Sequence, residues 1–451
     1  MSALANAYLA SRRSRYVAAA IVCGLVIAML AASSAVDYRL VRSIPARLAV
    51  FGLGATLVAA VATYLGVRAI DKDPSERRRH LIRAATLLGL AALFWLLILD
   101  SFVFTHEAGA GAIAVFTLAC LPTTAFGLWV VRRLDRYEPE PWGLILLAAG
   151  WGAIVATSLV VWGESTWEDA SFRFLVPGPG LDASIAFSAG LFEELAKGVA
   201  VLLLFLVMRN AFDDVVDGIV YGAAVGLGFN FLESISYMAL LYSDFGPAEG
   251  AYAAGAQWYA RQVLGLFFGH ATYTALIGAG IGIARQLADR RRAILAILSG
   301  WVVAIAAHFA WDAWLTFFPV SRTPLALVEV HLRTIVMDGP FTAAVAALLV
   351  MGIVREGLAL RQELEREAET GAGAVMPEEV GILINPWRRL ATRWDVFSRF
   401  GFRSYRHLYR LQRAQLALAM ERWHRQRQEI DSPPDAEQEL RARVIALRSA
   451  R

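Results

Sequence analysis

Long apolar runs alternate with short polar connections up to residue 354, and the pattern is charged after that point. Each run has roughly 20 residues or more, the length that a helix needs to cross ~30 Å of hydrocarbon. The runs occupy residues 16–36, 48–70, 84–104, 112–131, 143–162, 183–208, 218–242, 261–284, 293–318 and 335–354. The pattern predicts an all-α fold, a polytopic transmembrane helix bundle of about ten spans.

Polar segments divide this predicted bundle into three parts. Residues 1–131 hold four runs with few ionisable groups, which we interpret as a scaffold, and residues 132–354 hold six runs with a distinct polar set. Residues 355–451 are rich in Arg, Glu, Gln and Leu with helical spacing, which predicts a charged α-helical tail. The connections 163–182 and 243–260 are predicted to be loops that cover the outer face.

Lys and Arg concentrate in alternate connections, beginning with the N-terminal segment. The positive-inside rule then places both termini, and hence the tail, in the cytoplasm. An alternative is that the first run is a signal peptide cleaved after Ala35, which would leave nine spans and an external tail.

The composition agrees with a membrane protein and favours lipid over nucleic acid as a binding partner. The chain is 57% hydrophobic and 18% charged, which excludes a water-soluble globular domain. Its formal net charge of +4 suits anionic lipids of a bilayer, and no nucleic-acid-binding motif is present. Cys23 and Cys120 lie in separate apolar runs, so we expect them to pack as small apolar residues without forming a disulfide.

Ionisable side chains interrupt four consecutive runs of the second half. The sequence GLFEELAKGV at 190–199 places Glu193, Glu194 and Lys197 inside one apolar run, although a charged group there costs about 2.5 to 3.5 kcal/mol. The next three runs contribute further acids and imidazoles. These are Glu233, His270, His308 and Asp312.

Depth and helical spacing predict that these groups form one cluster. Glu193, Glu233, His270 and His308 each lie about nine or ten residues from a predicted outer end, or about 15 Å below it. Intramembrane charges face the interior of a bundle and pair there. Lys197 is four residues from Glu193 and three from Glu194, so it can neutralise a glutamate. The spacing also places His308 and Asp312 on one helix face.

Two kinds of water-activating chemistry fit the cluster. Two imidazoles and a carboxylate are donors typical of zinc, and His270, His308 and Glu233 are the candidate ligands if a metal is used. Alternatively, a glutamate acts as general base without a metal. The sequence leaves both routes open.

Small and acidic residues frame the same region. Gly218, Gly222 and Gly226 repeat every four residues in one run, and Gly278 and Gly282 continue the pattern in the next, which predicts close helix packing. Asp213, Asp214 and Asp217 precede or begin a predicted helix, where we expect them to cap its N-terminus.

Five motifs resemble those of the PrsW family of bacterial intramembrane proteases, which is related to the CAAX prenyl protease superfamily. They are DRYEPEPW at 135–142, EELAK at 193–197, DDVVDGIVYGAAVGLGFNFLES at 213–234, FFGHATYTALIGAGIG at 267–282 and HFAWD at 308–312. The likeness covers about residues 132–354. Ser234 and Asp312 depart from the asparagines that are common in the family.

The resemblance implies an intramembrane endopeptidase of the bacterial inner membrane whose substrate is a membrane-bound, anti-sigma-factor-like protein. It implies catalytic roles for Glu193, Glu194, Glu233, His270 and His308, with Lys197 and Asp312 in support. A proton- or ion-coupled transporter, which would use the same residues as a relay, is the alternative from another class. A non-catalytic scaffold that binds a partner through the tail is a third. The oligomeric state is not predicted.

Overall fold

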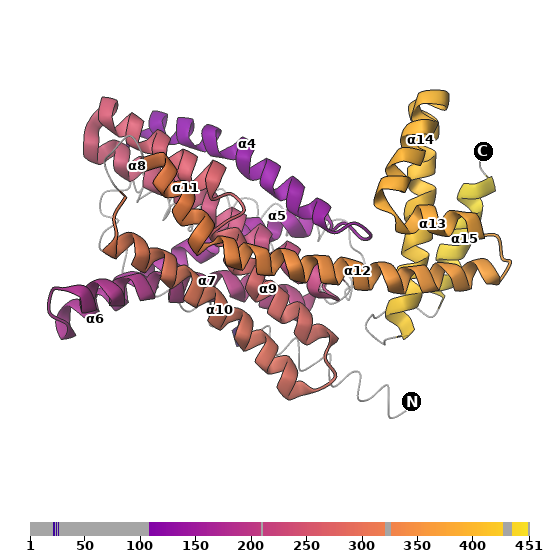
Figure 1. Ribbon diagram of the computed structural model, residues 1–451, viewed down its shortest axis with the longest axis horizontal. Helices are drawn as coiled ribbons and strands as arrows, with labels where there is room; N and C mark the ends of the chain where they lie inside the picture. The colour runs from indigo at the N-terminus through magenta and orange to yellow at the C-terminus, as the bar shows by residue number, and fades with distance from the viewer. Residues whose placement is uncertain are drawn as a thin grey trace, which may run out of the picture.

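The computed structural model describes residues 108–208, 211–320, 326–426 and 435–449, with four positions between 21 and 26. The predicted spans 48–70 and 84–104 lie outside the described residues, and so does nearly all of 16–36. The described part is helical throughout and contains no strand. Figure 1 shows a bundle from which one long helix, α12, reaches a separate group formed by α13, α14 and α15.

The bundle is formed by the ten helical elements from α4 to α11 and most of α12. In chain order they are α4 (Ala110–Leu134), α5 (Trp142–Gly150), the π-helical η3 (Trp151–Ala156), α6 (Thr157–Phe174), α7 (Pro179–Val207), α8 (Val215–Trp258), the π-helical η5 (Tyr259–Leu264), α9 (His270–Gln286), α10 (Arg290–Phe317), α11 (Ala326–Met337) and α12 (Gly339–Glu369). The C-terminal helices are α13 (Pro377–Ile384), α14 (Pro386–Gln426) and α15 (Ala436–Ser449).

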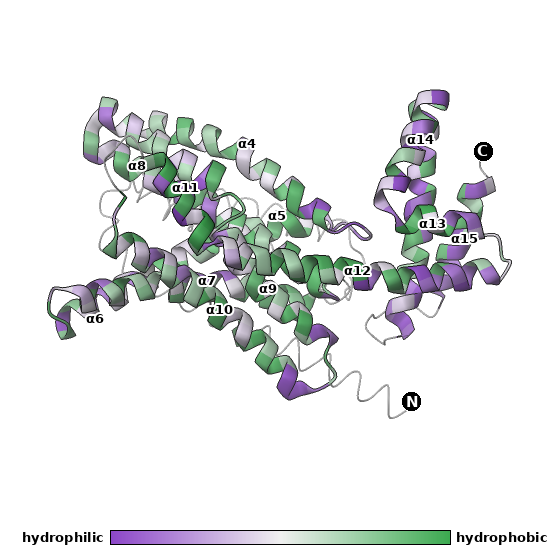
Figure 2. Cartoon of the chain, viewed as in Figure 1, coloured by the Kyte–Doolittle hydropathy of each residue, from purple (hydrophilic) through white to green (hydrophobic). Residues whose placement is uncertain are grey.

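The predicted spans 112–131, 143–162, 183–208, 218–242 and 293–318 fall almost entirely on helix, whereas residues 265–269 interrupt the predicted span 261–284 and Asp338 interrupts 335–354. Five helical segments are long and apolar enough to cross a membrane. They are 110–134, 142–174, 215–264, 290–317 and 339–369. α7 carries three of the charged cluster residues within its apolar sequence, and α9 has only 17 residues. Figure 2, coloured by residue hydropathy, shows mostly hydrophobic residues along the helices of the bundle and many hydrophilic residues along the C-terminal helices. The chain is therefore a helical membrane protein.

Two predicted loops differ from the structure. The expected loops 163–182 and 243–260 are largely helical, because α6 continues to Phe174 and α8 to Trp258 with a bend at Gly246, whose φ is 75°. The first part of the predicted tail continues α12, which runs unbroken to Glu369. Its charged end is stabilised by the C-terminal helices, where Arg422 contacts both Glu363 and Glu367.

α8 is the central helix of the bundle, because 89% of its apolar window is buried, against 22% for α10. Asp214 caps its first turn by accepting hydrogen bonds from the amides of Val216, at 2.6 Å, and Asp217, at 3.2 Å. The capping expected for Asp214 is therefore confirmed, and it anchors the start of the helix on which the polar cluster depends.

Glycine allows α8 and α9 to touch through their backbones. A Cβ built at Gly222 would lie 2.3 Å from the carbonyl oxygen of Thr274, and one at Gly226 would lie 2.2 Å from that of His270. Gly218 meets Gly278 in the same way. The predicted close packing of these helices is confirmed, and any side chain on this face would push α9 away.

We therefore expect Gly226→Ala to destabilise the protein by about 1–3 kcal/mol, because the added methyl group overpacks a backbone contact. Thermal unfolding of the purified full chain in detergent measures the effect. Gly255→Ala is the matched control, since a Cβ at that helical position meets nothing within 4 Å. Equal melting temperatures for the two variants would contradict this account of the helix contact.

Candidate active site

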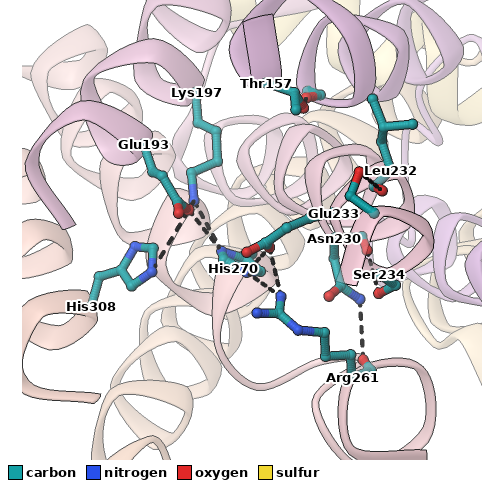
Figure 3. A network of polar contacts seen from close by, with 12 residues as sticks. Thr157, Glu193, Lys197, Asn230, Leu232, Glu233, Ser234, Arg261, His270 and His308 are labelled. Carbon is teal, nitrogen blue, oxygen red and sulfur yellow. Dashed lines mark hydrogen bonds and ion pairs between the residues drawn. The ribbon is translucent and has the colours of Figure 1, made fainter. Parts of the chain in front are cut away.

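Four elements bring the predicted polar residues to one cavity. α7 supplies Glu193, α8 supplies Glu233, α9 begins with His270, and α10 supplies His308. All four side chains line a cavity of about 780 Å³, and Asp312 lines it as well. Figure 3 shows their charged and imidazole groups pointing toward one another. Side chains separated by more than a hundred residues along the chain thus share one site.

Lys197 lies at the centre of the cluster and is completely buried. Its Nζ is 3.2 Å from Glu193 Oε2 and 2.5 Å from Glu194 Oε1, so it pairs with both glutamates, as the helical spacing allowed. It also lies 3.0 Å from His270 Nδ1 and 4.3 Å from the ring centre of Phe229. One ammonium group therefore compensates two buried carboxylates.

The two adjacent glutamates have different surroundings. Glu194 is fully buried and does not line the cavity, and its oxygens face Lys197, His308 Nδ1 at 3.0 Å and the hydroxyl of Thr274 at 3.3 Å. Glu193 lines the cavity, where its Oε2 lies 3.5 Å from His270 Nδ1 and 3.7 Å from His308 Nε2. Glu193 is therefore the carboxylate of this pair that can meet a substrate or water.

A carboxylate holds one nitrogen of each imidazole. Glu194 contacts Nδ1 of His308, and Glu233 Oε2 lies 2.7 Å from Nε2 of His270. Since the Lys197 ammonium can only donate, His270 Nδ1 accepts from it and the ring proton belongs on Nε2, facing Glu233. The remaining nitrogens, His270 Nδ1 and His308 Nε2, both face Glu193, and His308 Nε2 is also 3.4 Å from Asp312 Oδ2.

Arg261 is a member of the site that sequence reasoning missed. It was placed at the boundary of a span, whereas in the structure η5 directs its Nη1 to within 2.6 Å of Glu233 Oε2. Two polar residues hold this segment against α8. Asn230 donates to the Arg261 carbonyl at 3.1 Å, and Gln262 donates to the Ser234 hydroxyl at 2.9 Å. An arginine inside an apolar run was the signal that a buried acid must lie nearby.

The donor set fits a metal ion. Glu193, Glu194, His270 and His308 each offer one ligand atom, and these atoms lie within 4.8 Å of one another. Two imidazoles with carboxylates are donors that zinc accepts, and the carboxylates behind both rings are the support that ligating histidines commonly have. Glu233, which the sequence suggested as the third ligand, is not in this group, because its carboxylate is paired with Arg261 and His270.

The fold and the cluster define a helical membrane protein with a buried acid and imidazole site. Comparison with known proteins gives its family. Residues 140–356 match the family described as PrsW family intramembrane metalloprotease.

Among the relatives, Protease PrsW of Bacillus subtilis (strain 168) is 34% identical over 186 residues, which cover 40% of this chain and 74% of that protein. Protease PrsW of Geobacillus kaustophilus (strain HTA426) is 28% identical over 143 residues, which cover 31% of this chain and 59% of that protein. No solved structure matches the chain. The chain belongs to the PrsW family, as the motifs suggested.

Loss of the central cation should destabilise the fold. In chelator-treated protein we expect Lys197→Met to lower the free energy of unfolding by about 3–5 kcal/mol, because it leaves buried carboxylates without a counterion. The control is Arg361→Met, whose ion pair with Glu365 is exposed; it should cost about 1 kcal/mol or less. Thermal unfolding of both variants in detergent tests the difference, and a Lys197→Met protein as stable as its control would disprove it.

Proposed function

We propose that this protein is an intramembrane endopeptidase that hydrolyses a peptide bond of a membrane-protein substrate. The observation that carries the proposal is the convergence of Glu193 and two carboxylate-supported imidazoles on a cavity of about 780 Å³. A volume of this size accommodates a short extended segment of polypeptide together with a water molecule. Membership of the PrsW family supports the same reaction.

His270, His308 and Glu193 are the side chains that would hold a metal ion. His270 Nδ1 and His308 Nε2 both face Glu193 Oε2, while Glu233 and Glu194 hold the opposite nitrogens of the two rings. A bound zinc ion would polarise the scissile carbonyl and lower the pKa of water. The protein's own contribution is to fix the tautomer and direction of each imidazole before substrate arrives.

Glu193 also suits the metal-free route. As a carboxylate at the cavity it can accept the proton of an attacking water and return it to the leaving amine. Lys197, 3.2 Å away, stabilises the charged form of this base. The Arg261 guanidinium and the Lys197 ammonium are the positive groups nearest to the site, so the oxyanion of the tetrahedral intermediate would develop close to compensating charge.

The proposal also includes a substrate class and a location in the cell. An anti-sigma-factor-like protein with a single membrane span is the substrate class that fits the family resemblance. The bacterial inner membrane, with both termini in the cytoplasm, is the location that the distribution of Lys and Arg favours.

Cleavage of a single-span reporter by the purified full chain in detergent tests the proposal. We expect Glu193→Gln and His270→Ala each to reduce the rate of cleavage by about 100-fold or more, since each loses a group that activates water or a donor atom. Glu378→Gln, which alters an exposed acid of α13, is the control and should cleave like the wild type.

The same assay distinguishes the two routes and the rival class. If a chelator abolishes cleavage and zinc restores it, Glu193 is a metal ligand. If cleavage resists the chelator but still requires Glu193, Glu193 is the general base. Full activity of both site variants would reject the protease. Ion flux in proteoliposomes without any cleavage would favour a transporter.

A further inference from the structure

A second acidic cluster lies at the end of the bundle that meets the C-terminal helices. It surrounds a cavity of about 200 Å³ formed by the turn between α4 and α5, the start of α8, α12 and α14. Seven of the lining residues are acidic. They are Asp135, Glu138, Glu140, Asp213, Asp214, Asp217 and Glu356. The intramembrane site uses none of them.

The backbone holds several of these carboxylates in fixed positions. Asp135 Oδ1 accepts from the amides of Tyr137, at 3.1 Å, and Glu138, at 2.9 Å, and so closes the turn after α4. Asp217 Oδ2 accepts from the amides of Asp213, at 2.8 Å, and Asp214, at 3.2 Å. These hydrogen bonds leave the second oxygen of each carboxylate to face other groups.

Two of the acids have a buried oxygen with no hydrogen-bond partner among the described residues. These atoms are Asp135 Oδ2 and Glu356 Oε2. Asp135 is 3% exposed and Glu356 is 4% exposed, so water does not solvate them freely, and both side chains line the cavity. A buried acid oxygen without a partner is costly unless a proton or a cation compensates it.

Positive charge from the described part of the chain does not balance this cluster. Arg413 is the one arginine or lysine among the residues that line the cavity, and His424 lies outside the lining with its Nε2 3.0 Å from Asp213 Oδ2. Binding of a cation would therefore compensate negative charge that the lining residues leave unbalanced.

We propose that this cluster binds an oxygen-preferring divalent cation that joins the α4–α5 turn, the start of α8 and α12, next to the C-terminal helices. Asp135, Glu140 and Asp217 offer ligand atoms that lie within 4.8 Å of one another, and Glu356 of α12 lines the same cavity. Carboxylate oxygens are the donors that Mg²⁺ and Ca²⁺ prefer, whereas the imidazoles of the intramembrane site suit zinc. The two centres are thus distinct in donor chemistry.

The position of the cluster explains what such a cation would stabilise. The turn that carries Asp135 already contacts the C-terminal helices, since Tyr137 donates to the Ile384 carbonyl at 3.0 Å and Arg389 donates to the Arg136 carbonyl at 2.7 Å. Seven acids at this junction repel one another and oppose the contact. A divalent cation removes that repulsion and holds the turn, α8 and α12 together.

Thermal unfolding of the purified full chain in detergent tests the proposal. After treatment with EDTA, millimolar Mg²⁺ or Ca²⁺ should raise the melting temperature of the wild type by about 2 °C or more, and K⁺ at the same ionic strength should not. The double variant Asp135→Asn, Glu356→Gln should lose this shift, because it removes charge from two ligands without changing their size. If that variant does not fold, Glu356→Gln alone should require about tenfold more cation for half of the shift.

Two control variants locate the effect. Glu378→Gln removes an exposed acid of α13, and Glu193→Gln changes the intramembrane site; both should retain the full shift with Mg²⁺ or Ca²⁺. A wild type that responds to neither ion, or equally to K⁺, would overturn the proposal, and so would a double variant that responds like the wild type. Loss of the shift in Glu193→Gln would place the cation at the other site. Because the readout is stability, the result does not depend on proteolysis.

Discussion

The direct backbone contact between α8 and α9 determines where the site forms. Gly226 allows the carbonyl oxygen of His270 to approach within 2.2 Å of the place where a Cβ would lie, so α9 can begin against the middle of α8. Gly269, with φ of 65°, lets the chain turn into that first residue. His270 consequently enters the cavity at the start of its helix, between Lys197 and Glu233. A larger residue on this face would move the imidazole away from both partners.

Charge compensation is the second requirement of a polar site inside an apolar bundle. Lys197 and Arg261 are surrounded by acids, and each contacts a carboxylate within 2.6 Å. In a low dielectric, such pairs are tolerated only when the geometry is close and the remaining atoms are bonded. The fold meets this condition by giving Glu194 three partners. Glu193, with its atoms nearer to the cavity, remains available for chemistry.

Much of this arrangement could be predicted because it depends on periodicity. Run length predicted most of the helices from residue 112 onward but not the breaks at residues 265–269 and at Asp338, and equal depth brought Glu193, Glu233 and His308 into one predicted cluster. Arg261 was missed because η5 is a π-helical turn, and no sequence period announces where such a turn points a side chain. The extension of α6 and α8 was missed for a related reason, since Gly246 followed by Pro247 reads as a loop but forms only a bend between two helices.

The acidic cluster shows the limit of reasoning from one segment at a time. Asp214 was correctly expected to cap α8, and Asp217 completes the capping box, yet capping accounts for only these two of the seven acids that meet there. Glu140 comes from the turn before α5. Glu356 comes from α12 and lies more than two hundred residues further along the chain. Only the tertiary fold reveals that these acids share a cavity without a matching lysine such as the intramembrane site possesses.

In the intramembrane site Lys197 supplies a cation from the chain itself, and its ammonium contacts the same oxygen and nitrogen atoms that would bind a metal. Metal binding there must therefore displace the ammonium, whereas the residues that line the acidic cavity include one cationic side chain, Arg413, beside seven acids.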